Sequence, residues 1–302
     1  MKKSKYIALA AVAAFTVAPL SACGAGQSNG SESKNYEIAM VAKGFSQSFW
    51  VSVHQGADDA AAKYGATVTF NGPDNDSQVD KQADMVQNAI NKSPDAVAIA
   101  PLDEAALTPA VQSAKSASIP LFAFDTAFET NADAITSTVK TSNREVGKVA
   151  AENLIALLNG KGKYAVIAHS QTDATSTERR DGFLDYMKKN APDMEMVGEV
   201  QYSNADQAKA QDIASAILQA NPDLDAIFAT NEATVVGAAT PVESALKSGH
   251  KVLLVGVDSG KAQQQYIRDG VISGSVSQNP YQIGYKTCLL YTSDAADDLL
   301  CV

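Results

Sequence analysis

"VDKQADMVQNAINKSPDAVAIAPLDE" (residues 79–104) aligns without a gap with "QAKAQDIASAILQANPDLDAIFATNE" (residues 207–232), 128 positions further along the chain. In each stretch an amphipathic helix pattern runs into a Pro-Asp turn, and a short apolar strand pattern follows. Both strand patterns end in a polar pair, Asp103-Glu104 in the first and Asn231-Glu232 in the second. The matching turn, strand length and terminal pair predict two lobes of the same topology, although unrelated βαβ units share part of this pattern.

The same alternation of strand and helix patterns extends on both sides of the repeat. Apolar, β-rich runs lie at 36–42, 66–70, 95–100, 119–124, 163–169, 195–201, 224–230, 251–257 and 271–277. Short apolar strands that alternate with helices predict βαβ units and parallel sheets. We therefore expect an α/β fold of two Rossmann-like lobes with parallel sheets, joined by a hinge. The predicted N-terminal lobe is 36–141 plus 279–287, the C-terminal lobe is 142–278, and the hinge crossings are Thr141-Ser142 and Gln278-Asn279.

The N-terminus is typical of an export signal. Basic "MKKSK" precedes an apolar run from Tyr6 to Leu20, which is too short to span a membrane as a mature helix. "LSAC", ending at Cys23, resembles a bacterial lipobox, which implies removal of 1–22 and lipidation of Cys23; the alternative is an ordinary signal peptide with an incidental cysteine. Residues 23–35 are predicted to be a flexible tether, so we expect an extracytoplasmic protein held at the membrane by acyl chains.

Composition narrows the class of protein further. The only other cysteines are Cys288 and Cys301, close to the C-terminus, so no disulfide framework stabilises the body of the chain. The 34 acidic residues outnumber the 24 basic ones, which argues against a nucleic-acid partner. We expect a monomer whose stability comes from apolar burial.

Polar residues collect at the predicted strand ends, where open α/β sheets bind their ligands. They are 46–50, 101–103, Asp125-Thr126, 169–173 followed by Arg179, Asn231-Glu232, Asp258-Ser259 and Gln278-Asn279. Carboxylates, amides and a guanidinium group suit a ligand dense in hydroxyl groups. Phe49 and Trp50, the only tryptophan, follow the first strand, and a sugar ring could stack on them. The alternative is that both rings pack under the first helix as core.

These residues lie in motifs that resemble a known family. "SFW", "FAFDT", "TERRDGF", "FATNE", "VGVDS" and "SVSQNPYQIG" look like the ribose-binding branch of the sugar-specific substrate-binding proteins of ABC importers, from about Tyr36 to Lys286. The resemblance implies a type I periplasmic binding protein fold, a monosaccharide bound between two lobes, and delivery to the membrane permease subunits of an ABC importer. By this resemblance the ligand-binding residues are Phe49, Trp50, Asp125, Arg179, Asn231, Asp258 and Gln278.

Three positions depart from the ribose-binding pattern. Thr126 stands where an arginine usually follows the strand-end aspartate, Ala100 replaces an expected asparagine, and Ala205 replaces an expected aromatic residue. These changes remove polar groups and a ring, so they imply more space and a different pattern of hydroxyl groups. The ligand is therefore expected to be a larger or differently configured pentose or hexose.

An enzyme is the first rival interpretation, and the sequence does not favour it. Of the three histidines only His169 lies at a predicted strand end, and no G-x-S-x-G motif accompanies it, so a structural or ligand-contacting role is expected. No phosphate-binding G-x-x-x-x-G-K-[ST] loop or H-E-x-x-H motif occurs. "DNDSQVDKQADM" (74–85) begins like a calcium loop, but Val79 and Met85 stand where glycine and glutamate are required. We expect no metal or cofactor.

Two binding proteins of the same fold class remain for comparison. A sugar-responsive repressor would need a DNA-binding domain before the first lobe, where this chain has an export signal. A receptor that presents a sugar or a furanose-type signal to a membrane sensor stays open as the alternative to an importer component.

The tail "CLLYTSDAADDLLCV" (288–302) departs from the family resemblance. The family pattern would continue the helix begun by "NPYQIGYK" and add a closing strand and a third crossing. Instead, the codons for Cys288 to Ser293 can be those at the end of a common transposase sequencing adapter. We therefore expect 288–302 to be an artefactual tail that packs loosely after a helix ending at Thr287, with a natural C-terminal βα unit of about 30 residues missing. The alternative is a genuine divergent tail.

Overall fold

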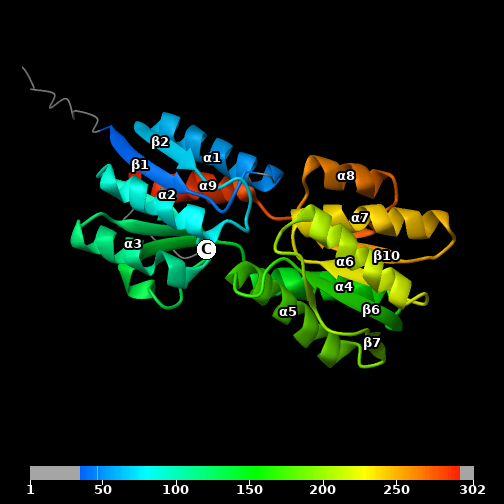
Figure 1. The fold of residues 1–302 in the computed structure, drawn as a ribbon. Coiled ribbons are helices and arrows are strands. Elements are labelled where there is room, and N and C mark those ends of the chain that lie inside the picture. The colour runs from blue at the N-terminus through cyan, green and yellow to red at the C-terminus, as the bar shows by residue number, and fades with distance from the viewer. Residues whose placement is uncertain (1–34, 46, 293–302) are drawn as a thin grey trace, which may run out of the picture. The chain divides into compact units, whose positions relative to one another are not determined.

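The computed structural model describes residues 35–45 and 47–292, and its strands form two parallel sheets flanked by helices (Figure 1). The first sheet has the order β2-β1-β3-β4-β5. Its strands are β1 (Tyr36–Val41), β2 (Ala66–Asn71), β3 (Ala96–Ile99), β4 (Leu121–Asp125) and β5 (Ile135–Lys140). Every neighbouring pair in this sheet is parallel.

The second sheet has the order β11-β10-β9-β6-β7, with β8 also paired to β6. Its strands are β6 (Gly162–Ala168), β7 (Met194–Met196), β8 (Gln201–Tyr202), β9 (Ala226–Ala229), β10 (Leu253–Val257) and β11 (Gly274–Val276). All of these pairings are parallel too. The α/β fold with two parallel sheets is thus confirmed.

Helices connect the strands and cover both faces of each sheet. They are α1 (Ser48–Tyr64), α2 (Val79–Asn91), α3 (Glu104–Ser116), α4 (Asn143–Leu158), α5 (Ala174–Asn190), α6 (Gln207–Ala220), α7 (Glu232–Lys247), α8 (Lys261–Arg268) and α9 (Pro280–Thr292), with a short 3₁₀ helix η1 (Ala132–Ala134). None of the helices in the described part of the chain is long and apolar enough to cross a membrane.

Strand β3 shows why these short apolar runs form central strands. All four of its residues are buried, and successive side chains point to opposite faces of the sheet. Ala96 and Ala98 join the core under α1 and α9, whereas Val97 and Ile99 join the core under α2 and α3. The second sheet is built alike, with one core under α4 and α5 and another under α6 and α7.

The sequence repeat folds into equivalent units in the two halves. Its first copy forms α2 and β3, and its second copy forms α6 and β9, each strand lying in the middle of its sheet. The residue before each following helix caps it in the same way: Asp103 accepts a hydrogen bond from Ala106 N at 3.0 Å, and Asn231 accepts one from Thr234 N at 2.9 Å. The polar pairs recognised in the sequence therefore begin α3 and α7.

Strand β5 was missed by the sequence analysis. Its residues "ITSTVK" alternate between half-buried and exposed, and it is the edge strand of the first sheet among the described residues. A search for continuous apolar runs finds central strands and overlooks a polar edge strand of this kind. The run predicted at 195–201 is likewise divided into the short strands β7 and β8.

The predicted end of the last helix at Thr287 is wrong, because α9 continues to Thr292. The expected loose packing is also wrong for 288–292. Cys288 is fully buried, and the ring of Tyr291 lies edge-on to Tyr36, with the ring centroids 5.2 Å apart. Gly284, Cys288 and Tyr291 recur at helical spacing, so the added residues continue the buried stripe of α9. Residues 293–302 lie outside the described residues, and the origin of the tail stays a prediction.

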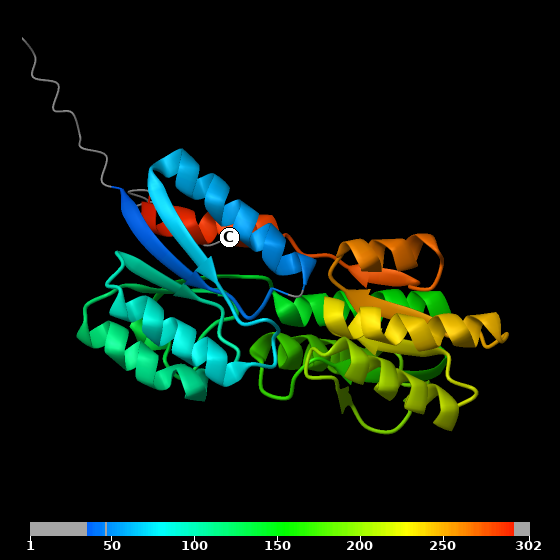
Figure 2. The ribbon, with the colours of Figure 1, turned by 45° about the horizontal axis from the view of Figure 1, so that its top comes forward.

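Glycines allow two pairs of helices to approach closely. Helices α1 and α9 lie side by side although they are far apart in the sequence (Figures 1 and 2). A Cβ atom on Gly56 would lie 2.0 Å from the carbonyl oxygen of Tyr281. Helices α4 and α5 also approach closely at a glycine, since a Cβ on Gly147 would lie 2.0 Å from the carbonyl oxygen of Arg179. Neither contact leaves room for a side chain.

We expect Gly147→Ala to lower the free energy of unfolding by about 1–3 kcal/mol, because the added methyl group must separate α4 from α5. Urea denaturation followed by circular dichroism measures the change. Gly274→Ala is the matched control, since no atom lies within 4 Å of its added Cβ. Equal effects of the two substitutions would contradict this account of helix packing.

Candidate functional site

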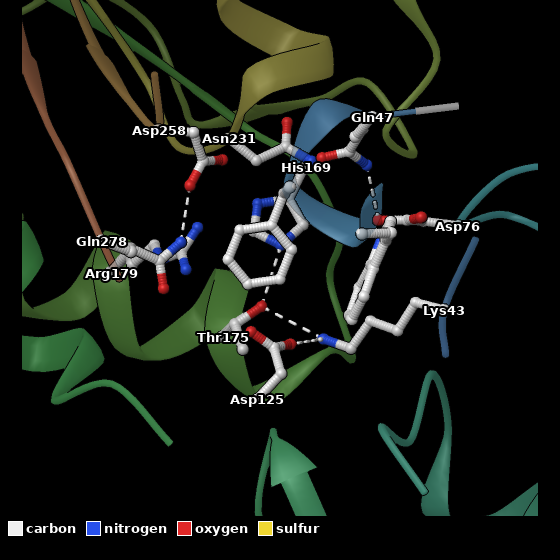
Figure 3. A pocket seen from close by; sticks show the side chains of 12 residues that line it. Lys43, Gln47, Asp76, Asp125, His169, Thr175, Arg179, Asn231, Asp258 and Gln278 are labelled. Carbon is white, nitrogen blue, oxygen red and sulfur yellow. Dashed lines mark hydrogen bonds and ion pairs between the residues drawn. The ribbon is translucent and has the colours of Figure 1, made fainter. Parts of the chain in front are cut away.

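A cavity that is partly open to solvent lies at the carboxyl ends of strands from both sheets (Figure 3). It is lined by Lys43, Gln47, Phe49, Trp50, Asp76, Asp125, His169, Thr175, Arg179, Asn231, Asp258 and Gln278. The parallel topology explains this gathering, because these residues lie at the carboxyl end of a strand, in the loop after it or in the first two turns of the next helix. All seven residues predicted to bind ligand are among the twelve.

The two strand-end aspartates have an unusual backbone. Asp125 ends β4 with a φ of 62°, and Asp258 follows β10 with a φ of 80°. Residues other than glycine rarely adopt this left-handed region, and such strain gathers at ligand-binding sites. Equivalent places in the two halves thus hold a strained, buried carboxylate.

Asp258 is oriented by bonds to two of its neighbours. Its Oδ2 accepts a hydrogen bond from Glu232 N at 2.9 Å, and its Oδ1 accepts one from Gln278 Nε2 at 2.5 Å. The second of these bonds is visible in Figure 3. Asn231 is fixed as well, because its Oδ1 caps α7, which leaves its Nδ2 amine as a donor toward the cavity.

Arg179 is held in one plane by acceptors from two elements. Its Nε donates to Asn143 Oδ1 at 2.8 Å, and its Nη1 donates to the carbonyl oxygen of Thr230 at 2.9 Å. Arg179 is buried, with an exposed fraction of 3%. The remaining N–H groups of this rigid fork can meet a ligand oxygen without further ordering.

His169 belongs to the framework of the cavity. Thr175 donates its hydroxyl proton to Asp173 Oδ1 at 2.6 Å, so its oxygen can only accept from His169 Nε2 at 3.1 Å. The proton is therefore on Nε2, and Nδ1 accepts from the hydroxyl of Thr230 at 2.7 Å. Burial lowers the pKa of His169 to about 3, so the ring is neutral at ordinary pH. A neutral imidazole with both ring nitrogens in hydrogen bonds is suited to holding neighbouring side chains in place rather than to transferring protons.

Lys43 is the most heavily bonded charge in the cavity. Its Nζ lies 2.5 Å from Asp173 Oδ2, 3.1 Å from Asp125 Oδ2 and 3.3 Å from Thr175 Oγ1. Burial lowers the pKa of Lys43, but the two carboxylates outweigh that effect and raise it above its usual value. Burial would likewise raise the pKa of Asp173, yet Lys43 and His169 hold it below its usual range. Lys43 and Asp173 therefore both stay charged at neutral pH.

The aromatic pair Phe49 and Trp50 is part of the core and also reaches the cavity. Phe49 and Trp50 belong to the core under α1, and both also line the cavity. Their rings meet edge to face, with centroids 4.8 Å apart and planes at 88°. The Nε1 atom of Trp50 is buried and has no hydrogen-bond partner among the residues that the structure describes. It is one of three such orphaned atoms around this cavity, with Asp76 Oδ1 and Gln278 Oε1.

Four lining residues were not among the predicted ligand contacts. Gln47 lies in the strand-end stretch 46–50 noted in the sequence, whereas Lys43, Asp76 and Thr175 are named by no motif that the sequence analysis used. One signal was available, because Asp76 follows β2 and Lys43 follows β1, as the strand-end rule requires. Among the residues that the structure describes, no group of three histidine, cysteine, aspartate or glutamate side chains could hold a metal ion.

Comparisons with known proteins agree with this geometry. A model of the periplasmic binding protein domain matches residues 38–293. The D-allose-binding periplasmic protein of Escherichia coli is 30% identical over 254 residues, which are 82% of this chain and 81% of that protein. The ribose import binding protein of Bacillus subtilis is 29% identical over 274 residues, 90% of this chain and 84% of that protein.

Solved structures agree as well. An ABC transporter solute-binding protein from Agrobacterium vitis with bound D-fucose is 35% identical and superimposes with a TM-score of 0.79. The match covers 84% of this chain and 88% of that one. A second protein from the same organism, bound to α-D-tagatopyranose, is 28% identical with a TM-score of 0.80, over 89% of this chain and 91% of that one.

Proposed function

The chain belongs to the periplasmic binding protein family, and we propose that it binds a monosaccharide in this cavity and delivers it to an ABC importer. One observation carries the proposal: the cavity combines two oriented carboxylates, a fixed guanidinium group and two aromatic rings. Charged acceptors and donors pair strongly with hydroxyl groups, and the rings offer an apolar surface to sugar C–H groups. All seven residues predicted from the sequence are included as proposed ligand contacts.

We further propose that the ligand is a larger or differently configured pentose or hexose than ribose. Ala205 lines a second hollow, partly open to solvent, which shares Asp76 and His169 with the cavity. An alanine here fills less of this hollow than the aromatic residue that the ribose-binding pattern would place at this position. Space beyond the pentose ring is consistent with relatives whose structures hold D-fucose and α-D-tagatopyranose.

The proposed mechanism is binding and closure, without catalysis. The proposed lobes are 36–141 plus 279–287 and 142–278, hinged near Thr141-Ser142 and Gln278-Asn279. The cavity is lined from both sheets, so a bound sugar contacts both lobes only in the closed state and thereby favours that state. The neutral His169 and the fully engaged Lys43 supply no general base or nucleophile.

We also propose that the protein is a monomeric lipoprotein, anchored outside the cytoplasm through Cys23 after loss of the signal 1–22. These residues lie outside the described part of the structure, and the proposal rests on the lipobox-like "LSAC". A Cys23→Ser variant that stayed in the membrane fraction would count against the anchor.

We expect Asp125→Ala and Asp258→Ala each to weaken binding of the best monosaccharide by about 2–3 kcal/mol, because each leaves charged partners unpaired in a buried site. Isothermal titration against aldopentoses, aldohexoses, ketohexoses and amino acids measures the loss. Trp50, the only tryptophan, gives a second signal through its fluorescence.

The control is Asp193→Ala, which removes an exposed carboxylate and should leave the affinity unchanged. Thermal unfolding of each variant separates lost contacts from lost folding. The proposed function fails if no monosaccharide binds the unaltered chain at about 1 mM, the weakest useful affinity for a specific site. Unchanged affinity in both cavity variants would overturn the assigned contacts.

A further inference from the structure

The loop between β2 and α2 is stabilised by hydrogen bonds among its own residues, and its Asp76 side chain points into the cavity. Asn75 Oδ1 accepts hydrogen bonds from the backbone and hydroxyl groups of Ser77 at 3.1 and 2.6 Å. Exposed Asp74 pairs with Lys81 at 2.7 Å. Asp76 takes part in neither contact, and its side chain lines the cavity beside Gln47 (Figure 3). The acid is therefore not needed to shape the loop.

One oxygen of Asp76 has no partner. Its Oδ2 accepts a hydrogen bond from Gln47 Nε2 at 2.7 Å, but its Oδ1 is buried and bonded to none of the described residues. The carboxylate rests against Gly44, where a Cβ atom would lie 2.7 Å from Oδ1. A buried carboxylate oxygen without a donor is costly, so a site of this kind calls for a donor from outside the chain.

The lysine of the cavity is committed to other acids. Lys43, whose charge acts on Asp76, is already bonded to Asp125 and Asp173. Burial raises the pKa of Asp76 to about 7, an effect that Lys43 opposes and that Asp173 and Asp125 reinforce. The acids of the lining, Asp76, Asp125 and Asp258, outnumber its bases, Lys43 and Arg179.

We propose that Asp76 is a specificity-determining residue, which accepts a hydrogen bond from a hydroxyl or ammonium group of the sugar and excludes sugars with an acidic group there. The inference rests on the proposed function, since the donor belongs to the bound sugar. Hydroxyl and ammonium groups both donate to a carboxylate, whereas a second carboxylate would meet an excess of negative charge.

The test compares Asp76→Asn with the unaltered full chain. Asparagine keeps the size of the side chain and can still accept from Gln47, so the exchange removes the charge and replaces the ligand-facing acceptor oxygen with a donating NH2 group. The probes are D-allose, D-fucose, D-galactose, D-galactosamine and D-galacturonate, measured by isothermal titration. Asp74→Asn is the matched control, because it makes the same exchange two positions away on an exposed carboxylate of the same loop.

We expect Asp76→Asn to weaken the tightest neutral or amino sugar about ten-fold, and Asp74→Asn to change it less than about two-fold. D-Galacturonate should bind the unaltered chain at least about ten-fold more weakly than D-galactose. Tighter binding of D-galactosamine than of D-galactose would identify the donor as an ammonium group. The reverse order would identify it as a hydroxyl group, and either order supports the contact.

The pH profile gives a readout that does not depend on how well the variant folds. Ionised Asp76 is the better acceptor, so affinity should fall about three- to ten-fold as the pH drops from about 8 to about 6. Lys43 and Asp173, which face Asp76 together with Asp125, stay charged because their pKa values are raised and lowered, respectively. The Asp76→Asn profile should be flat over this range.

Different results would contradict the proposed role of Asp76 and the proposed sugar-binding function. If the unaltered chain binds a sugar and Asp76→Asn binds it within two-fold at every pH, this inference is overturned and the proposed function stands. If neither the unaltered chain nor Asp74→Asn binds any probe or any other monosaccharide, the proposed function falls and this inference falls with it.

Discussion

The ammonium group of Lys43, bonded to Asp125 at 3.1 Å and to Asp173 at 2.5 Å, determines the electrostatics of the whole cavity. Two buried carboxylates near each other would repel, and one of them would take up a proton. The cation between them offsets this repulsion, so Asp125 can line the cavity while Asp173 caps α5. Because Lys43 is bonded to these two aspartates, it does not pair with Asp76, whose Oδ1 has no hydrogen-bond partner among the described residues.

The parallel topology explains why these charges meet. Side chains that follow different strands of a parallel sheet arrive at one edge, however far apart they lie in the sequence. Lys43 and Asp173 are separated by 130 positions, yet each follows a strand. The left-handed backbone of Asp125 and Asp258 then turns both carboxylates into the cavity at equivalent places. The repeat in the sequence corresponds to equivalent helix–strand units, α2–β3 and α6–β9, in the two sheets.

The sequence predicted the sheets and much of the cavity for identifiable reasons. Apolar runs such as β3 are buried on both faces, and strand ends mark the ligand side, so Asp125 and Asp258 could be found. Strand β5 escaped because an edge strand needs few apolar residues. Lys43 and Asp76 also follow strands, but they were missed because their roles depend on partners distant in the sequence, which no sequence motif names. The packing of 288–292 was misjudged, since any apolar residues at helical spacing can extend a buried stripe.

The most direct test of the central claim is a crystal structure of the protein grown with the tightest monosaccharide of the titration panel. The account predicts one sugar in the cavity, with hydroxyl groups about 2.6–3.2 Å from carboxylate oxygens of both Asp125 and Asp258. Its ring should lie against Phe49 or Trp50. A sugar bound elsewhere, or one that touches only one of the two aspartates, would contradict the account.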